Sequence, residues 1–117
     1  MNNKNYIVEL RSWFRLQKRY LDSEKGRGIK IQVQGNSMFP TFKDGEEINI
    51  ISAKYSEPRI GSILLFMHHE DHATVHRVVG IIKIENKTFY RTKGDANIKK
   101  DYYLVPEEEI VGIVDRC

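Results

Sequence analysis

Two kinds of hydrophobic pattern divide the chain. Residues 3–24 repeat apolar and aromatic side chains at helical spacing, and the basic side chains lie mostly off that face, which predicts one amphipathic helix. Glycines at positions 26 and 28 end this pattern. From residue 27 onward, short apolar or alternating runs are separated by turn residues, as in strands. We therefore predict an N-terminal helix over residues 1–26 and a β domain over residues 27–117.

The β domain contains six runs that predict strands. They cover residues 29–33, 47–51, 63–66, 75–84, 87–92 and 110–114. Glu85 and Asn86 lie between two of these runs and form the expected tip of a hairpin, since asparagine favours tight turns. Residues 106–109, Pro-Glu-Glu-Glu, predict a helical turn with proline at its first position. The expected fold class is mainly β with one amphipathic helix.

Composition narrows the class of protein. The chain has 117 residues, of which 40% are hydrophobic and 30% charged, as in one globular domain with its own core. Its one cysteine, Cys117, excludes an internal disulfide, and the net charge of +3 does not by itself indicate nucleic acid. The longest apolar run, residues 60–67, is far shorter than a membrane span. We therefore expect a soluble, cytoplasmic protein without an anchor.

The segment of residues 35–41 is the first candidate for chemistry. It reads Gly-Asn-Ser-Met-Phe-Pro-Thr and follows a predicted strand. Gly35 permits unusual backbone angles and Pro40 restrains the chain, so the segment can hold a tight turn that presents Ser37. An exposed hydroxyl with a free backbone N–H is what an acyl-transfer nucleophile needs. The alternative is an ordinary loop in which the serine has no special role.

A nucleophilic serine requires a base and benefits from an acid that orients it. His76 lies within an otherwise apolar predicted strand, where an ionisable side chain is either a satisfied core residue or a functional one. Asp95 and Asp101 follow a later strand in a polar loop. Both aspartates could instead be residues of a solvated turn.

The order of these segments resembles the signal peptidase I superfamily, which includes the LexA-type self-cleaving repressors. The resemblance covers about residues 30–114. It rests on residues 35–41, on 61–66 (Gly-Ser-Ile-Leu-Leu-Phe), on 76–80 (His-Arg-Val-Val-Gly) and on 92–97 (Thr-Lys-Gly-Asp-Ala-Asn). It implies a small coiled β-barrel, and it places Met38, Pro40, Arg77 and Gly94 in the structural part of these motifs.

The resemblance also implies roles at the site. Ser37 matches the nucleophile, and His76 stands where bacterial members have a lysine base, as in the archaeal and endoplasmic-reticulum branch. Asp101 is the favoured partner of His76, with Asp95 as a structural or supporting acid. Gly35 stands where many signal peptidases have a serine that donates to the oxyanion. The Ser37 backbone N–H is therefore one oxyanion donor and the second is unassigned.

Several alternatives remain at this point. Lys93 is a second candidate base, although it matches the Lys-Gly-Asp motif and not the base position. Residues 68–72, His-His-Glu-Asp-His, could ligate a metal, but we expect a solvated hairpin loop there, since the spacing differs from the His-Glu-x-x-His pattern. A self-cleaving repressor is disfavoured, because one helix is too little for a helix-turn-helix module and the chain contains neither Ala-Gly nor Cys-Gly.

The sequence thus predicts a serine endopeptidase that removes a leader or signal-like segment from a precursor, after a small residue. It needs no metal or organic cofactor and binds no specific nucleic acid. The alternative is a weak or inactive peptidase-fold module that binds peptides or a partner protein. Residues 3–24 either pack on the β domain as core, or contact a leader peptide, a partner or an anionic membrane surface.

Overall fold

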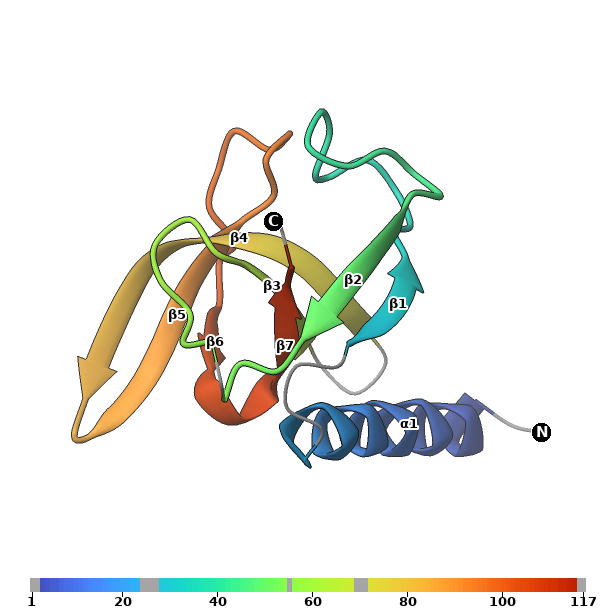
Figure 1. Ribbon diagram of the computed structural model, residues 1–117. Coiled ribbons are helices and arrows are strands. Elements are labelled where there is room, and N and C mark those ends of the chain that lie inside the picture. The colour runs from blue at the N-terminus through green and yellow to red at the C-terminus, as the bar shows by residue number, and fades with distance from the viewer. Residues whose placement is uncertain (1–2, 24–27, 55, 69–71, 116–117) are drawn as a thin grey trace.

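One helix packs against a curved antiparallel sheet (Figure 1). The computed structural model describes residues 3–23, 28–54, 56–68 and 72–115, with the side chains of residues 3–10 and 72 outside the description. Within these residues the sheet has seven strands in the order β1-β2-β7-β3-β4-β5-β6. The elements are α1 (Asn3–Ser23), β1 (Ile29–Gln32), β2 (Glu47–Ile51), β3 (Ile63–His68), β4 (His72–Ile84), β5 (Lys87–Lys93), β6 (Leu104–Pro106), the 3₁₀ turn η1 (Glu107–Glu109) and β7 (Ile110–Val114). The mainly β fold class is confirmed.

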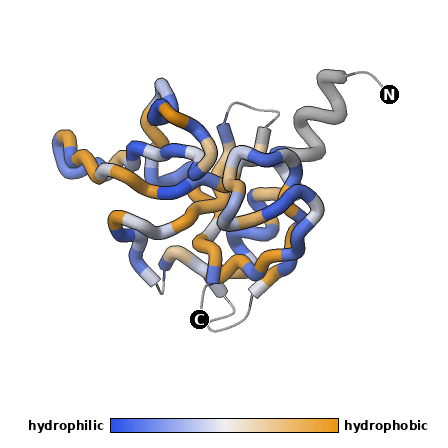
Figure 2. The backbone as a smooth tube through the Cα atoms, turned by 90° about the horizontal axis from the view of Figure 1, so that it is seen from above, coloured by the Kyte–Doolittle hydropathy of each residue, from blue (hydrophilic) through white to orange (hydrophobic). Residues whose placement is uncertain are grey.

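Strand β3 lies at the centre of the fold and separates two hydrophobic clusters. Ile63 and Leu65 point into the cluster that includes the helix, whereas Leu64 and Phe66 point into the other. Side chains alternate between the two faces of a strand, so a strand buried on both faces must be continuously apolar. Figure 2 shows apolar and polar stretches following one another closely along the backbone.

Two irregularities in the strand pairing accompany the curvature of the sheet. The pairing of β3 with β7 shifts between Leu65 and Phe66, and that of β4 with β5 shifts between Val78 and Gly80. Such bulges bend a strand and increase its twist. The hairpin of β4 and β5 turns at Glu85 and Asn86, both of which have positive φ, so the predicted hairpin tip is confirmed.

Among residues 11–23, whose side chains the structure describes, fewer reach the core than the helical pattern indicated. Phe14 and Leu21 are buried in the same cluster as the sheet residues, which supports the core interpretation for this face. Trp13 and Tyr20 belong to the same predicted stripe but are 45% and 39% exposed. Lys18, expected off the stripe, instead donates to the carbonyl of Ile110 on β7 at 2.9 Å. No helix in the described part of the chain is long and apolar enough to cross a membrane.

Candidate active site

Ser37 lies in a tight loop between β1 and β2. The loop is closed at its base by two backbone bonds, from Val33 N to Glu46 O at 2.9 Å and from Gly45 N to Val33 O at 2.7 Å. Gly35 has a φ of 84°, a conformation that favours glycine. Ser37 is partly exposed, and its backbone N–H has no acceptor among the described residues. The loop therefore presents both a hydroxyl and a free N–H, as the sequence predicted.

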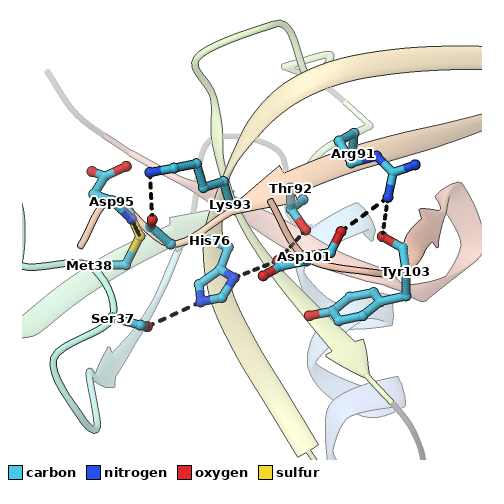
Figure 3. A network of polar contacts seen from close by, with 10 residues as sticks. Ser37, Met38, His76, Arg91, Thr92, Lys93, Asp95, Asp101 and Tyr103 are labelled. Atoms are coloured by element: carbon cyan, nitrogen blue, oxygen red, sulfur yellow. Dashed lines mark hydrogen bonds and ion pairs between the residues drawn. The ribbon is translucent and has the colours of Figure 1, made fainter. Parts of the chain in front are cut away.

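Ser37, His76 and Asp101 form a continuous row of polar contacts (Figure 3). His76 on β4 places Nε2 at 3.1 Å from Ser37 Oγ and Nδ1 at 2.7 Å from Asp101 Oδ2. The side chains of His76 and Asp101 are 9% and 10% exposed, so this contact is shielded from water. The geometry matches a serine, a base and an orienting acid.

Asp95 belongs to a different network. It forms a two-pronged ion pair with Arg77, with Nε to Oδ1 at 2.9 Å and Nη2 to Oδ2 at 2.8 Å. The Thr41 hydroxyl donates to Asp95 Oδ2 at 2.6 Å. The hydrogen bonds from Arg77 hold the pKa of Asp95 below its ordinary value of 3.8, with help from Thr41. Of the two predicted acids, the structure thus places Asp101 against His76 and Asp95 against Arg77.

The Arg77–Asp95 pair predicts an acid-sensitive part of the stability. Because the pKa of Asp95 is lowered on folding, its ionised carboxylate stabilises the folded protein in full well above pH 3.8. This stabilisation is lost as the pH falls from 3.8 through the lower pKa that Asp95 has in the folded protein. Asp95→Asn should lower the free energy of unfolding by about 2 kcal/mol at pH 7. Urea unfolding at pH 7 and pH 3 should show this difference shrinking in acid.

The control for this experiment is Glu47→Gln, which breaks an ion pair with Lys30 whose side chains are 65% and 60% exposed. Exposed pairs contribute little, so this variant should unfold like the wild type at both pH values. An Asp95→Asn variant with wild-type stability at pH 7 would contradict a stabilising role for the pair.

Gly94 and Met38 pack the loop of residues 94–101 against the serine loop. A methyl group at Gly94 would lie 2.7 Å from the Ser37 carbonyl oxygen and 3.1 Å from His76 Nε2, so only glycine fits without displacement. Met38 is buried, and its sulfur accepts the Asp95 N–H at 3.4 Å. Pro40 lies exposed in the serine loop. Lys93, the second candidate base, donates to the Gly94 carbonyl at 3.0 Å.

The prediction of a hairpin loop over residues 68–72 is partly wrong. His68 ends β3 and His72 begins β4, and the two residues pair across the strands. The ladder extends this far because β4 continues past its apolar part. The His68 ring stacks on Tyr103 with centroids 3.6 Å apart. Residues 69–71 lie outside the described residues. Among the residues that the structure does describe, no group of three or more side chains that could hold a metal ion occurs.

Two side chains that hold the aspartates were not singled out from the sequence. The Thr41 hydroxyl donates to Asp95, and the Thr92 hydroxyl donates to Asp101. Both threonines stood in recognised motifs but had no role assigned.

Two comparisons with known proteins match this chain to peptidases. A family model described as Peptidase S24-like matches residues 2–90. Signal peptidase I W of Bacillus subtilis (strain 168) is 32% identical over 79 residues, which are 67% of this chain and 42% of that protein. The chain therefore spans less than half the length of this relative. The family match includes Ser37 and His76 and ends before Asp95 and Asp101.

Proposed function

This chain belongs to the Peptidase S24-like family, and we propose that it is a serine endopeptidase in which His76 and Asp101 activate Ser37. The observation that carries the proposal is the row of contacts from Ser37 Oγ to His76 at 3.1 Å and from His76 to Asp101 at 2.7 Å. A serine hydroxyl alone is a weak nucleophile, and an adjacent oriented base is what activates it.

Each residue has one role in the proposed reaction. His76 Nε2 takes the proton of Ser37 as the oxygen attacks the peptide carbonyl, and later delivers it to the leaving amine. Asp101 accepts the Nδ1 proton, which fixes the tautomer with a free Nε2 lone pair and stabilises the imidazolium. The Ser37 N–H donates to the oxyanion that forms on the carbonyl.

The substrate we propose is a leader or signal-like segment of a precursor protein, cut after a small residue. Its support is the resemblance of the motifs and the similarity to a signal peptidase. An open sheet edge close to Ser37 also supports an extended peptide as substrate. Among the described strands, β1 pairs with β2 alone, so its other edge is open, and Ser37 follows the end of β1 by five residues. An open strand edge can bind a peptide through main-chain hydrogen bonds.

A role for residues 3–24 in binding is part of this proposal. Phe14 and Leu21 face the core, whereas Trp13, Leu16 and Tyr20 are exposed on the other side of the helix. An exposed aromatic and apolar face suits contact with a leader peptide, a partner or an anionic membrane surface.

The test is whether Ser37 is activated. A fluorophosphonate or β-lactone probe should label the wild type at Ser37 and should leave Ser37→Ala unlabelled, because only an activated serine reacts rapidly. Mass spectrometry of candidate precursors should show a cleavage product with the wild type only. Ser23→Ala is the matched control, since this serine lies at the end of α1 and donates to the Tyr20 carbonyl.

A wild-type protein that takes up no probe and cleaves no precursor would contradict the peptidase proposal. The same protein binding a precursor peptide without cutting it would favour an inactive peptidase-fold module. Cleavage that persists in Ser37→Ala would exclude Ser37 as the nucleophile.

A further inference from the structure

The carboxylate of Asp101 has a second donor besides His76 (Figure 3). Its Oδ2 lies 2.7 Å from His76 Nδ1 and 2.6 Å from the hydroxyl oxygen of Thr92. An ionised carboxylate can only accept, so the Thr92 hydroxyl donates this hydrogen bond. A carboxylate oxygen has two lone pairs, and each of those on Oδ2 therefore has a donor. The carboxylate is held from two directions at the same oxygen.

The side-chain torsions of aspartate do not by themselves hold the carboxylate in this orientation. The torsion χ2, which rotates the two oxygens, has broad and roughly two-fold minima. With His76 as the one donor to Oδ2, the carboxylate could turn about that contact and lengthen or misalign it. The hydrogen bond from Thr92 restrains this rotation, and so keeps Oδ2 directed at His76 Nδ1.

The backbone around Asp101 is held separately from its carboxylate. The Asp101 N–H donates to the Thr92 carbonyl at 2.8 Å. Arg91 Nη1 donates to the carbonyls of Asp101 and Tyr103, at 3.1 Å and 3.3 Å. None of these three bonds uses the Thr92 hydroxyl. Removal of the hydroxyl alone should therefore release the carboxylate and leave the chain of Asp101 in place.

The strand register explains how Thr92 reaches this carboxylate. Thr92 on β5 pairs with Val78 on β4, and paired residues direct their side chains to the same face of a sheet. His76 lies two residues before Val78 and so points to that face as well. Thr92 and Val78 are both buried there. Valine has nearly the shape of threonine, so packing alone does not require the hydroxyl at this position.

We propose that Thr92 is a positioning residue for the reaction, which acts by holding the Asp101 carboxylate against His76. The inference rests on the proposed function, because there Asp101 orients the base. Within the described part of the chain, the Thr92 side chain forms a hydrogen bond with neither Ser37 nor His76. Its effect on Ser37 passes through Asp101 and then His76.

Two variants of Thr92 separate its hydroxyl from its shape. Thr92→Val keeps the branched shape and removes the hydroxyl, whereas Thr92→Ser keeps the hydroxyl and removes a methyl group. If the hydroxyl positions Asp101, valine is the more damaging replacement, and if Thr92 only packs the core, serine is. Thr88→Val is the matched control, because Thr88 lies four residues earlier on β5 and pairs with Lys83, away from the site.

The first measurement is the NMR signal of the His76 Nδ1 proton, which needs no enzyme activity. Hydrogen bonds to an ionised acceptor are short and strong, and their protons resonate at low field. The wild type, Thr92→Ser and Thr88→Val should all show this low-field signal. In Thr92→Val the signal should disappear through exchange with water, or move toward the position of a free imidazole.

The second measurement is the rate at which a fluorophosphonate probe labels Ser37, normalised to the folded fraction from urea unfolding. We expect Thr92→Val to lower this rate about tenfold through loss of orientation, and Thr92→Ser to stay within about threefold of the wild type. In an Asp101→Ala background, Thr92→Val should lower the rate no further, because the hydroxyl then has no carboxylate to hold.

Three results would overturn the inference. One is a Thr92→Val variant that keeps the wild-type Nδ1 signal. Another is a Thr92→Ser variant that is labelled more slowly than Thr92→Val, which would give Thr92 a packing role. The third is a further tenfold loss from Thr92→Val in the Asp101→Ala background. If the wild type takes up no probe, the proposed function fails, and the Nδ1 signal still decides whether Thr92 holds Asp101 against His76.

Discussion

Replacement of His76 by glutamine is expected to lower the rate of peptide cleavage by about 10⁴-fold to 10⁶-fold. Among the described side chains, His76 is the one hydrogen-bonded to Ser37 Oγ, at 3.1 Å, and glutamine cannot take up the serine proton. The same reasoning gives the pH dependence of the wild type. Its rate should be lower in acid than near neutral pH, because a protonated imidazole no longer accepts the serine proton.

The measurement is kcat/KM on a precursor peptide from acid to neutral pH for the wild type and His76→Gln. The control is His68→Gln, which removes an imidazole that stacks on Tyr103 and lies on the neighbouring strand. It should lose far less activity than His76→Gln. A wild-type rate that is flat with pH, or a His76→Gln rate within tenfold of the wild type, would exclude His76 as the base.

Asp101→Asn is expected to lower the cleavage rate by about 10⁴-fold without unfolding the protein. An amide at this position can donate to Nδ1, which turns the imidazole into the tautomer that carries its proton on Nε2, facing Ser37. The base is then blocked although the geometry is intact. Asp95→Asn should behave in the opposite way, because Asp95 bonds to Arg77 and Thr41 and not to His76. It should lose stability and keep most of its rate per folded molecule.

The two aspartate variants are best compared under conditions where urea unfolding shows both to be folded. The rate of Ser37 labelling, normalised to the folded fraction, separates an effect on the reaction from an effect on stability. If Asp95→Asn lost more activity per folded molecule than Asp101→Asn, the assignment of the orienting acid would be reversed.

The local pattern predicted most of the fold. The helix, expected over residues 3–24, spans Asn3–Ser23, and the six predicted strands are all present. The observed ends of two strands differ from the predicted ends because backbone pairing extends past the apolar residues. Strand β3 continues to His68 and β4 begins at His72, since these two residues pair with each other. The strand β6, Leu104–Pro106, was not predicted, since three residues carry no periodic signal and it forms by pairing with β5. Pro106 ends this strand and precedes η1, so the helical turn begins one residue later than predicted.

At the site, sequence reasoning reached the residues of the proposed catalytic row but not those that hold them. Ser37, His76 and the two aspartates stand in recognisable motifs, and the favoured pairing of Asp101 with His76 agrees with the contact at 2.7 Å. Thr92 could not be assigned a role, because its contacts with Asp101 depend on how the chain after β5 returns to that strand. The exposure of Trp13 could not be predicted either, because the pattern of a helix does not show which edge of its apolar stripe packs against the sheet.

The contacts between the serine loop and the loop of residues 94–101 have a mechanical consequence. Three bonds join them: Thr41 Oγ1 to Asp95 at 2.6 Å, Ala96 N to the Ser37 carbonyl at 2.8 Å, and Asp95 N to Met38 Sδ at 3.4 Å. These bonds hold the two loops together, although more than fifty residues of chain separate the bonded partners. The assembly of the site thus depends on folding of the whole domain, because in a two-state protein such distant segments come together only in the folded state.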